Sequence, residues 1–321
     1  MGFLLSKRTL GFKIEGTPYS AETLTAAYYD VAAYNINYDP DIAMKARKLA
    51  RGDYSQDVSI AGKRQMTISF SVDIHKGPAA TTAPNYFKCL RACGMYQDTG
   101  ADGINLVTHA EYNNVPATIE VVELDEGSSP SMLVVKAHGC MGNPKLVVDN
   151  VGEPMRIDFE FKGVFNGITD RAWASRMVPT TFDADLPEAV QGIGVTLFTE
   201  PQKCNTVTID LGNDVQVYTD PSKAQGVEGA RIVARNPTLE LDPDMELIAT
   251  QSDFARWTGN TTGVFSMQVG DRMYITAPAV QYTKTYAPGD REGHVANTKT
   301  CELKRGTYGN DELKIVHWDG A

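Results

Sequence analysis

The chain has few cysteines and no long apolar run, and both absences restrict its class. Its five cysteines among 321 residues are an odd and sparse set, which argues for reduced thiols made in a cytoplasm rather than for a disulfide framework. No apolar run approaches the roughly 20 residues that a membrane-spanning helix needs. The first residues also lack the charged-then-apolar order of a signal peptide. We therefore expect no membrane segment.

Positive charge is scarce as well. The chain has 30 Lys and Arg against 40 Asp and Glu, which gives a formal net charge of −10. Phosphate binding needs cationic grooves, so this balance argues against a protein that binds nucleic acid. Two interpretations of the acidity stay open. It keeps the protein soluble, which is the simpler reading, or it repels DNA from a surface along which DNA passes.

The sequence lacks the motifs of catalysis and cofactor binding. There is no G-x-S-x-G, H-E-x-x-H, Walker or Rossmann motif, and no pair of carboxylates is marked as facing across a cleft. The best metal candidate combines Cys89 and Cys93 on a predicted helix with His138 and Cys140 on a predicted hairpin. Cys and His do bind zinc, but the spacing is not C-x-x-C, and a small buried Cys is a common core residue. We expect no catalytic residues, no metal, no cofactor and no enzymatic activity.

The sequence does contain clear alternation of apolar and polar residues. From Met66 to Ile74 every second residue is apolar, and the same pattern returns over Met155–Val164. A period of two is typical of a strand that buries one face and exposes the other. Ala230–Leu241 is predicted as a further strand that is an edge strand or bulged at Pro237. The chain is therefore predicted to be mostly β.

Two short helices are predicted between the strands. The first has a cap at Thr82, apolar residues from Phe87 to Cys93 and a final Gly94. The second covers Ser252–Thr258 and ends at Gly259. Helices this short are not stable alone, so each must lie on a sheet.

The spacing of strand and helix suggests an internal repeat. Phe87 follows Ile74 at the same interval at which Phe254 follows Leu241. Two unrelated β domains with one accidental spacing are the alternative. We predict an all-β fold with short helices, as two tandem β-sandwich or barrel domains, each with one flanking α-helix. The first covers residues 1–168, a linker with Pro179 and Pro187 covers 169–191, and the second domain covers 192–321.

Several segments resemble a known family in their order and spacing. They are GKRQMTISFSVDIHKGPAATTAPNYFKCLRACG at Gly62–Gly94, IDLGNDVQVYTDPSKAQG at Ile209–Gly226, ARIVARNPTLELDP at Ala230–Pro243, ITAPAVQY at Ile275–Tyr282 and GNDELKIVH at Gly309–His317. Together they cover most of the chain. The sequence resembles tail tube proteins (major tail proteins) of long-tailed, siphovirus-like bacteriophages and prophages, of the two-domain type.

The resemblance implies a structural protein that polymerises as stacked rings into a hollow tail tube, the conduit for DNA ejection into the host. It implies homotrimeric rings with pseudo-six-fold symmetry, or alternatively hexameric rings. The implied partners are other copies of the chain, a tape measure protein, and tail terminator and tip proteins, and DNA passes through the lumen without specific binding. The implied location is the virion, with the host cytoplasm during assembly. The alternatives are a related tube or baseplate protein of a secretion-type injection system, or a β-sandwich carbohydrate-binding module or hydrolase.

Two surfaces follow from these expectations. Polar strand faces predict a lumen lining, because acidic or neutral side chains let DNA slide past without sticking, and an ordinary outer surface is the alternative. The predicted lumen-facing residues are Ser69, Ser71, Asp73, Asp158, Glu160, Asp210 and Glu302. A predicted turn and the basic stretch after it form the second surface, a loop that contacts the next ring. Its residues are Asp39, Pro40, Lys45, Arg47, Lys48 and Arg51. A solvated loop and a DNA-contacting patch are the alternatives here.

Overall fold

The fold is built from strands with two short α-helices. The computed structural model describes residues 8–47, 55, 57–75, 82–100, 103–108, 115–124, 131–172, 187, 189–190, 194–269, 273–307 and 309–317. The elements of the first half are β1 (Thr9–Ile14), the 3-10 turn η2 (Ala26–Tyr28), β2 (Ala33–Lys45), β3 (Ile60–Asp73), α1 (Phe87–Ala92), β4 (Met95–Gly100), β5 (Gly103–Thr108), β6 (Ala117–Leu124), β7 (Ser131–Val148) and β8 (Arg156–Ala172). The expectation of an all-β fold with short helices is confirmed.

The second half continues in the same style. Its elements are β9 (Val195–Leu197), β10 (Glu200–Pro201), β11 (Val207–Asp210), β12 (Asn213–Thr219), β13 (Val227–Arg235), β14 (Thr238–Leu241), α2 (Asp253–Thr258), β15 (Thr262–Val269), β16 (Met273–Arg291), β17 (His294–Leu303) and β18 (Lys314–His317).

One long sheet runs through both halves of the chain. Its strand order is β10-β9-β15-β16-β17-β14-β11-β7-β8-β3-β2, and all neighbouring strands are antiparallel. The halves meet where β11 pairs with β7, Ile209 opposite Leu146, and again where β18 pairs with β5. The strands β12 and β13 form a separate two-stranded sheet. The two halves therefore share their main sheet.

A row of apolar residues follows the register of this sheet from β3 to β16. Each member lies directly opposite the next on the neighbouring strand, so all point to the same face. The row consists of Val72, Ile157, Leu146, Ile209, Leu239, Cys301 and Tyr282. None of these residues is more than 5% exposed. The alternation in the sequence thus places one face of the whole sheet in the core.

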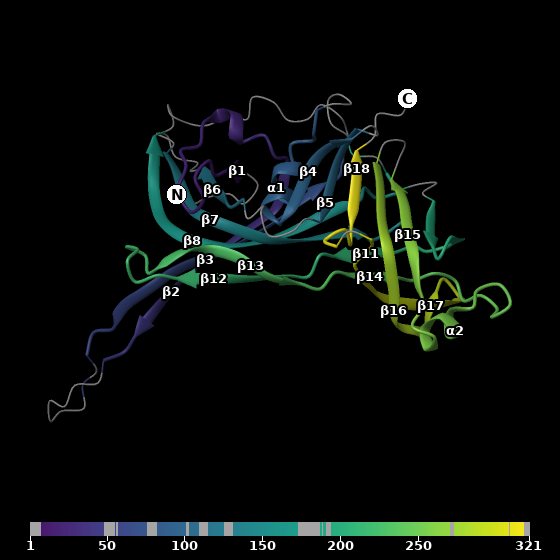
Figure 1. Cartoon of the computed structure of the whole chain (residues 1–321). Coiled ribbons are helices and arrows are strands. Elements are labelled where there is room, and N and C mark those ends of the chain that lie inside the picture. The colour runs from purple at the N-terminus through teal and green to yellow at the C-terminus, as the bar shows by residue number, and fades with distance from the viewer. Residues whose placement is uncertain are drawn as a thin grey trace.

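The core lies between the long sheet and a second layer. In Figure 1, β1, β6, α1, β4, β5 and β18 lie above β7, β8 and β3, and the β12–β13 hairpin lies below them. Strand β16 joins the layers, because Met273–Thr276 pairs with β18 and Val280–Arg291 pairs with β17. Helix α1 buries Phe87, Cys89 and Leu90. This is β-sandwich packing with a helix in the upper layer.

Both helices lie where the sequence predicts them. Helix α1 spans Phe87–Ala92, and Gly94 beyond its end has a φ of 81°, the left-handed conformation that glycine adopts without strain. Helix α2 ends at Gly259 as expected. The expected cap at Thr82 is wrong, because Tyr86 occupies the N-cap position.

The turn expected at Asp39 and Pro40 is also wrong, because both residues lie within β2. Pro40 pairs with Met66 on β3, and β2 is the last strand of the sheet in the part of the chain that the structure describes. Proline has no backbone N–H to donate to a strand on its second side, but an edge strand has no neighbour on that side. The edge position is therefore what makes a strand possible here.

Two further boundaries differ from expectation. The predicted strand Ala230–Leu241 is divided at Pro237 into β13 and β14, which belong to different sheets. β14 lies between β11 and β17, so it is not an edge strand. Strand β8 continues to Ala172, so the predicted domain boundary at residue 168 falls inside a strand. Of the predicted linker, residues 173–186 lie outside the described residues.

The junction of the halves gives a first prediction. Replacing Ile209 by Ala empties a fully buried site on β11, and we expect the free energy of unfolding to fall by about 2–5 kcal/mol in urea titrations. The matched control is Thr208→Ala, whose side chain is on the opposite face of the same strand and which should cost less than about 1 kcal/mol. Equal losses for both variants would show that the faces of β11 are assigned incorrectly.

Candidate assembly surfaces

The face of the long sheet that points away from the core carries a second row of directly opposed residues. This polar row crosses the sheet from β2 to β15 and passes through both halves. Its members are Tyr34, Ser71, Asp158, Lys145, Asp210, Thr238, Glu302, Gln281 and Thr262. Asp158, Asp210 and Glu302 are acidic and Lys145 is basic, so the charged members carry net negative charge at neutral pH.

The other predicted lumen residues lie beside the polar row. Ser69 is opposite Glu160, and Asp73 is opposite Arg156, on the same face of β3 and β8. All seven residues therefore share one face, although they come from four strands, β3, β8, β11 and β17, in two halves of the chain. Whether that face lines a lumen stays a prediction.

Hydrogen bonds hold several acids of this face in place. Ser71 Oγ donates to Asp158 Oδ1 at 2.7 Å, and Asn143 Nδ2 donates to Asp210 Oδ1 at 2.8 Å. Arg156 Nε lies 3.2 Å from Asp158 Oδ1. Ser71 is buried and the Asn143–Asp210 pair is part-buried, whereas the more exposed Arg156–Asp158 pair contributes little to stability. These contacts fix the side chains and engage Arg156, while Lys145 makes no salt bridge with a described residue.

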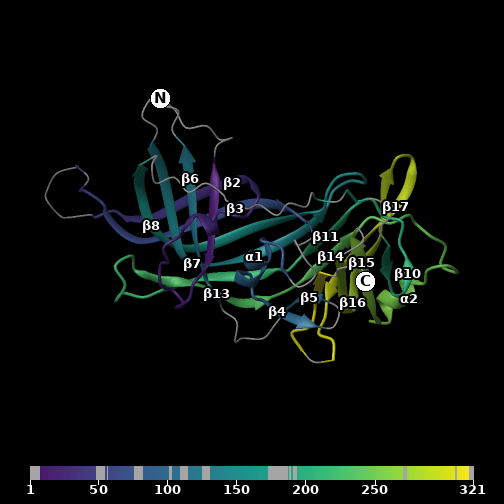
Figure 2. The same ribbon diagram turned by 90° about the horizontal axis from the view of Figure 1, so that it is seen from above.

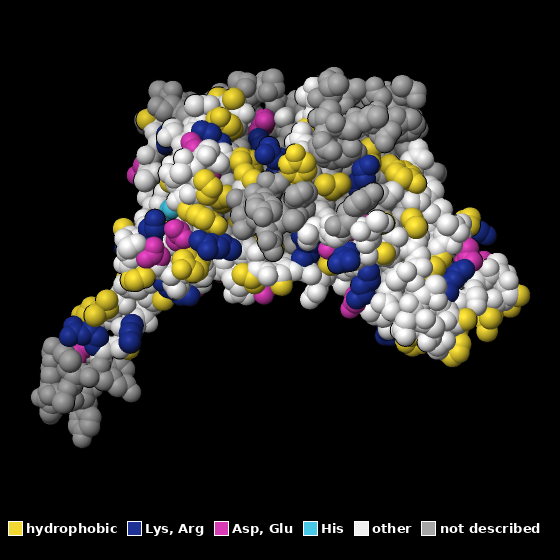
Figure 3. Space-filling model, viewed as in Figure 1, with side chains coloured by type: hydrophobic (Ala, Val, Ile, Leu, Met, Phe, Trp, Pro, Cys, Tyr) yellow, Lys and Arg dark blue, Asp and Glu magenta, His cyan; other side chains and the backbone are white. Residues whose placement is uncertain are grey.

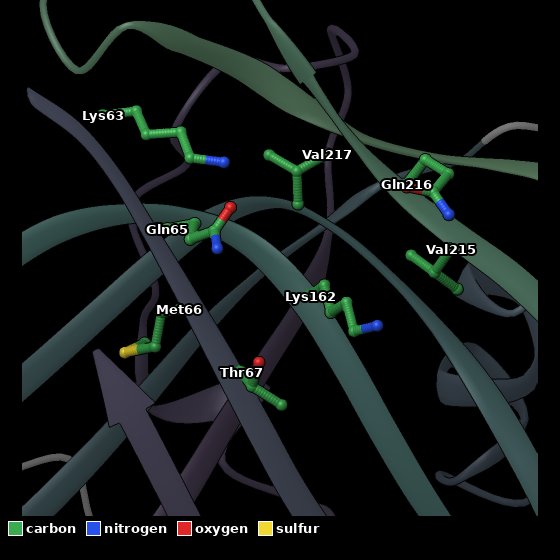
Figure 4. Close-up of a pocket in the computed structure, with 8 residues that line it drawn as sticks. All are labelled: Lys63, Gln65, Met66, Thr67, Lys162, Val215, Gln216 and Val217. Atoms are coloured by element: carbon green, nitrogen blue, oxygen red, sulfur yellow. The ribbon is translucent and has the colours of Figure 1, made fainter. Parts of the chain in front are cut away.

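The β12–β13 hairpin covers one end of the polar face. Val215 and Ala230 of the hairpin are buried against Met141 of β7. Beside this contact lies a hollow of about 270 Å³ between β3, β8 and β12. Figure 4 shows its lining, which is Lys63, Gln65, Met66, Thr67, Lys162, Val215, Gln216 and Val217. None of these described residues is aromatic, and an aromatic platform is what a sugar ring would pack on. The hollow therefore gives no support to a carbohydrate site.

The second predicted surface projects from the molecule as an arm. We use "the arm" for residues 40–47 and 58–65, which are the outer parts of β2 and β3 with the two residues next to each, and which extend beyond the rest of the sheet in Figures 1 and 2. Asp39, Pro40 and Lys45 belong to β2, so for them the expected loop is wrong. Arg47 follows β2 and is exposed, while Lys48 and Arg51 lie outside the described residues. The cations Lys45 and Arg47 do point to a surface that the fold leaves uncovered.

The arm also exposes apolar side chains that sequence reasoning missed. Met44 is 61% exposed and Val58 is 85% exposed, and Ile42 and Ile60 are exposed as well. Met44 is opposite Ala61, whereas Ile60 is opposite Lys45, so Met44 and Ile60 point to opposite faces of the hairpin. The available signal was the presence of four apolar residues in a stretch otherwise rich in charge.

The cysteines of the metal candidate lie in the core. Cys89, Cys93 and Cys140 are buried and free, and burial raises the pKa of each thiol well above its usual value. Burial also lowers the pKa of His138. Among the described residues, no cluster of three or more His, Cys, Asp or Glu side chains has the arrangement of a metal site. No helix in the described ranges is long and apolar enough to cross a membrane.

Comparison with known proteins adds no relative: no protein-family model matches the chain, and no curated protein matches it.

The buried thiols give a second prediction. Zinc binds thiolates, and these thiols stay protonated near neutral pH because they are desolvated. We expect the unfolding temperature to be the same with EDTA and with added zinc, measured by circular dichroism. A fall of several degrees on chelation would contradict this, because it would show that a bound metal stabilises the fold.

Proposed function

We propose that this chain is a structural protein that polymerises as stacked rings into the tail tube of a long-tailed bacteriophage. The observation that carries the proposal is the polar row, which follows a single sheet through both halves of the chain. In this proposal the row lines the lumen and DNA is ejected along it.

The chemistry of the row suits such a lining. DNA carries dense negative charge, and each cation that contacts a phosphate would add affinity and slow its passage. Asp158, Asp210 and Glu302 instead repel phosphate, and Lys145 and Arg156 stand among acids on the same face. The lining therefore conducts DNA without binding it specifically.

The ends of the sheet suit association between copies. β2 is the last strand of the long sheet in the part of the chain that the structure describes, and edge strands of this kind pair with or pack on other chains. Copies that join through such ends form a closed ring when the rotation that relates one copy to the next divides a full turn evenly. In this proposal the two halves of each chain occupy two of six positions in a ring, which gives homotrimeric rings with pseudo-six-fold symmetry, and hexameric rings are the alternative.

The proposal includes the partners and location that such a tube has. The chain would associate with itself, with a tape measure protein inside the growing tube, and with terminator and tip proteins at its ends. It would assemble in the host cytoplasm and remain in the virion.

Electron microscopy of the purified protein tests the proposal. We expect hollow tubes built from stacked rings in negatively stained preparations at high protein concentration. A species that is strictly monomeric under all assembly conditions, with no tube in particles that contain the protein, would overturn the proposal.

The lumen assignment makes a separate prediction. In a Cys204→Ser background, which removes the half-buried native thiol, a Glu302→Cys variant should react with a bulky polymer-linked maleimide when unassembled. In tubes it should react only with a small maleimide, because the polymer cannot enter a narrow channel. Equal reaction with the bulky reagent in both states would place Glu302 on the outer surface.

A further inference from the structure

We propose that the arm of one copy binds an apolar patch at the opposite end of a second copy. We call this surface the lobe patch, and its residues are Met245, Leu247, Ile248, Phe254 and Val295. The inference rests on the proposed function, because it assumes that copies of the chain associate. It goes further by naming the two surfaces that meet.

The lobe patch is a cluster of exposed apolar side chains at the end of the second half. Leu247 is 75% exposed and Phe254 is 53% exposed, and Met245, Ile248 and Val295 are also exposed. Met245 N donates to Val295 O, which holds the 244–250 segment against β17. In Figure 3, hydrophobic side chains gather along the lower right edge of the molecule, over the lobe that carries α2 and β17 in Figure 1. Clusters of this kind mark interaction sites.

Buried polar contacts fix the lobe patch in one shape. Asp253, next to Phe254, lies 2.8 Å from Lys299 Nζ, and both side chains are almost fully buried. Tyr282 Oη donates to Asp253 Oδ1 at 2.8 Å. On the next turn of α2, Arg256 pairs with Glu200 on β10 at 2.6 Å. The helix therefore presents Phe254 from a rigid base, which lowers the entropic cost of binding.

The arm presents the complementary surface. Ile42, Met44 and Ile60 are exposed on a two-stranded ribbon, Met44 and Ile60 on its opposite faces, and Val58 is exposed just before β3. A lone two-stranded hairpin with apolar residues on both faces is only marginally stable in water. An apolar partner on the Met44 face would bury the apolar side chains of that face.

Charge favours the same pairing. The arm carries Lys45, Arg47, Lys63 and Arg64, which are exposed and make no salt bridge within the described part of the chain. Around the lobe patch, Glu246, Asp290 and Glu292 are exposed and likewise make no salt bridge among described residues. A cationic ribbon and an acidic rim attract each other, and this complementarity sets orientation and association rate. It also argues against pairing of two arms or of two lobe patches.

The position of the two surfaces determines the kind of assembly. The arm and the lobe lie at opposite ends of the molecule in both Figure 1 and Figure 2. Contact between them is head-to-tail, because each copy uses one surface to bind and offers the other to the next copy. Such contacts continue from copy to copy until they close a ring or form a filament. The occupant of the lobe patch is therefore a second copy of this chain.

Cross-linking between two variants that each carry one added, exposed cysteine tests the contact, since the native Cys89, Cys93, Cys140 and Cys301 are buried. One protein carries Met44→Cys and the other Leu247→Cys, each with Cys204→Ser, and the two are mixed and treated with a short bis-maleimide. We expect the mixture to form at least about tenfold more cross-linked dimer than either variant alone, since only unlike surfaces meet. The matched control mixes Met44→Cys with Ile168→Cys, an exposed apolar site on β8 away from the lobe.

A substitution provides a second readout. We expect Leu247→Asp to raise the protein concentration needed for self-association about tenfold, as loss of a central apolar contact does at other interfaces. Its urea midpoint should match the wild type, because the side chain is exposed.

The outcomes separate this inference from the proposed function. If the wild-type protein forms tubes but the Met44→Cys and Leu247→Cys variants do not cross-link, the inference is overturned and the proposed tube still stands. The cross-link without any tube would support the inference and count against the proposed function. Absence of both would overturn both, and an equal yield from the Ile168 control would overturn the inference alone.

Discussion

The structure depends on the register of one antiparallel sheet across the junction between β7 and β11. There, Val207 to Asp210 pair with Val148 to Lys145, residue for residue. Because successive side chains point to opposite faces, a slip by one residue would turn Ile209 to the outer face and bring Asp210 into the core. The cost of burying an unpaired carboxylate makes that slip strongly unfavourable. This register gives the two halves a common core face and a common polar face.

The rest of the chain covers the two faces of the long sheet to different extents. The apolar face is covered by other elements of the same chain. These are α1, the strands β1 and β6, and the strands β4, β5 and β18, of which β18 pairs with β16. Among the described residues, the β12–β13 hairpin covers one end of the polar face, near Met141. The arm and the lobe patch leave further surfaces uncovered at the ends. A long polar face and ends with exposed apolar side chains suit association with other copies, which is the basis of the proposals made above.

Much of this could be predicted from the sequence, because it depends on local pattern. The alternation over Met66–Ile74 and Met155–Val164 identified β3, β8 and their faces, and Gly94 and Gly259 marked the ends of both helices. Long-range pairing could not be predicted, because alternation determines which face a residue takes but not which strand lies beside it. Alternation places each of the seven polar residues on the outer face of its own strand, and only the register shows that these faces are one. Pro40 was misread because Asp-Pro signals both a turn and an edge strand, and Met44 was missed because exposure is a tertiary property.

The central claim is that the polar row faces a channel formed by several copies. A cryo-electron microscopy reconstruction of the assembled protein, at a resolution that separates strands, tests it most directly. The account predicts a hollow assembly in which Ser71, Asp158, Asp210 and Glu302 line the channel wall. A reconstruction in which these residues lie on the outside, or are buried in contacts between copies, would contradict it.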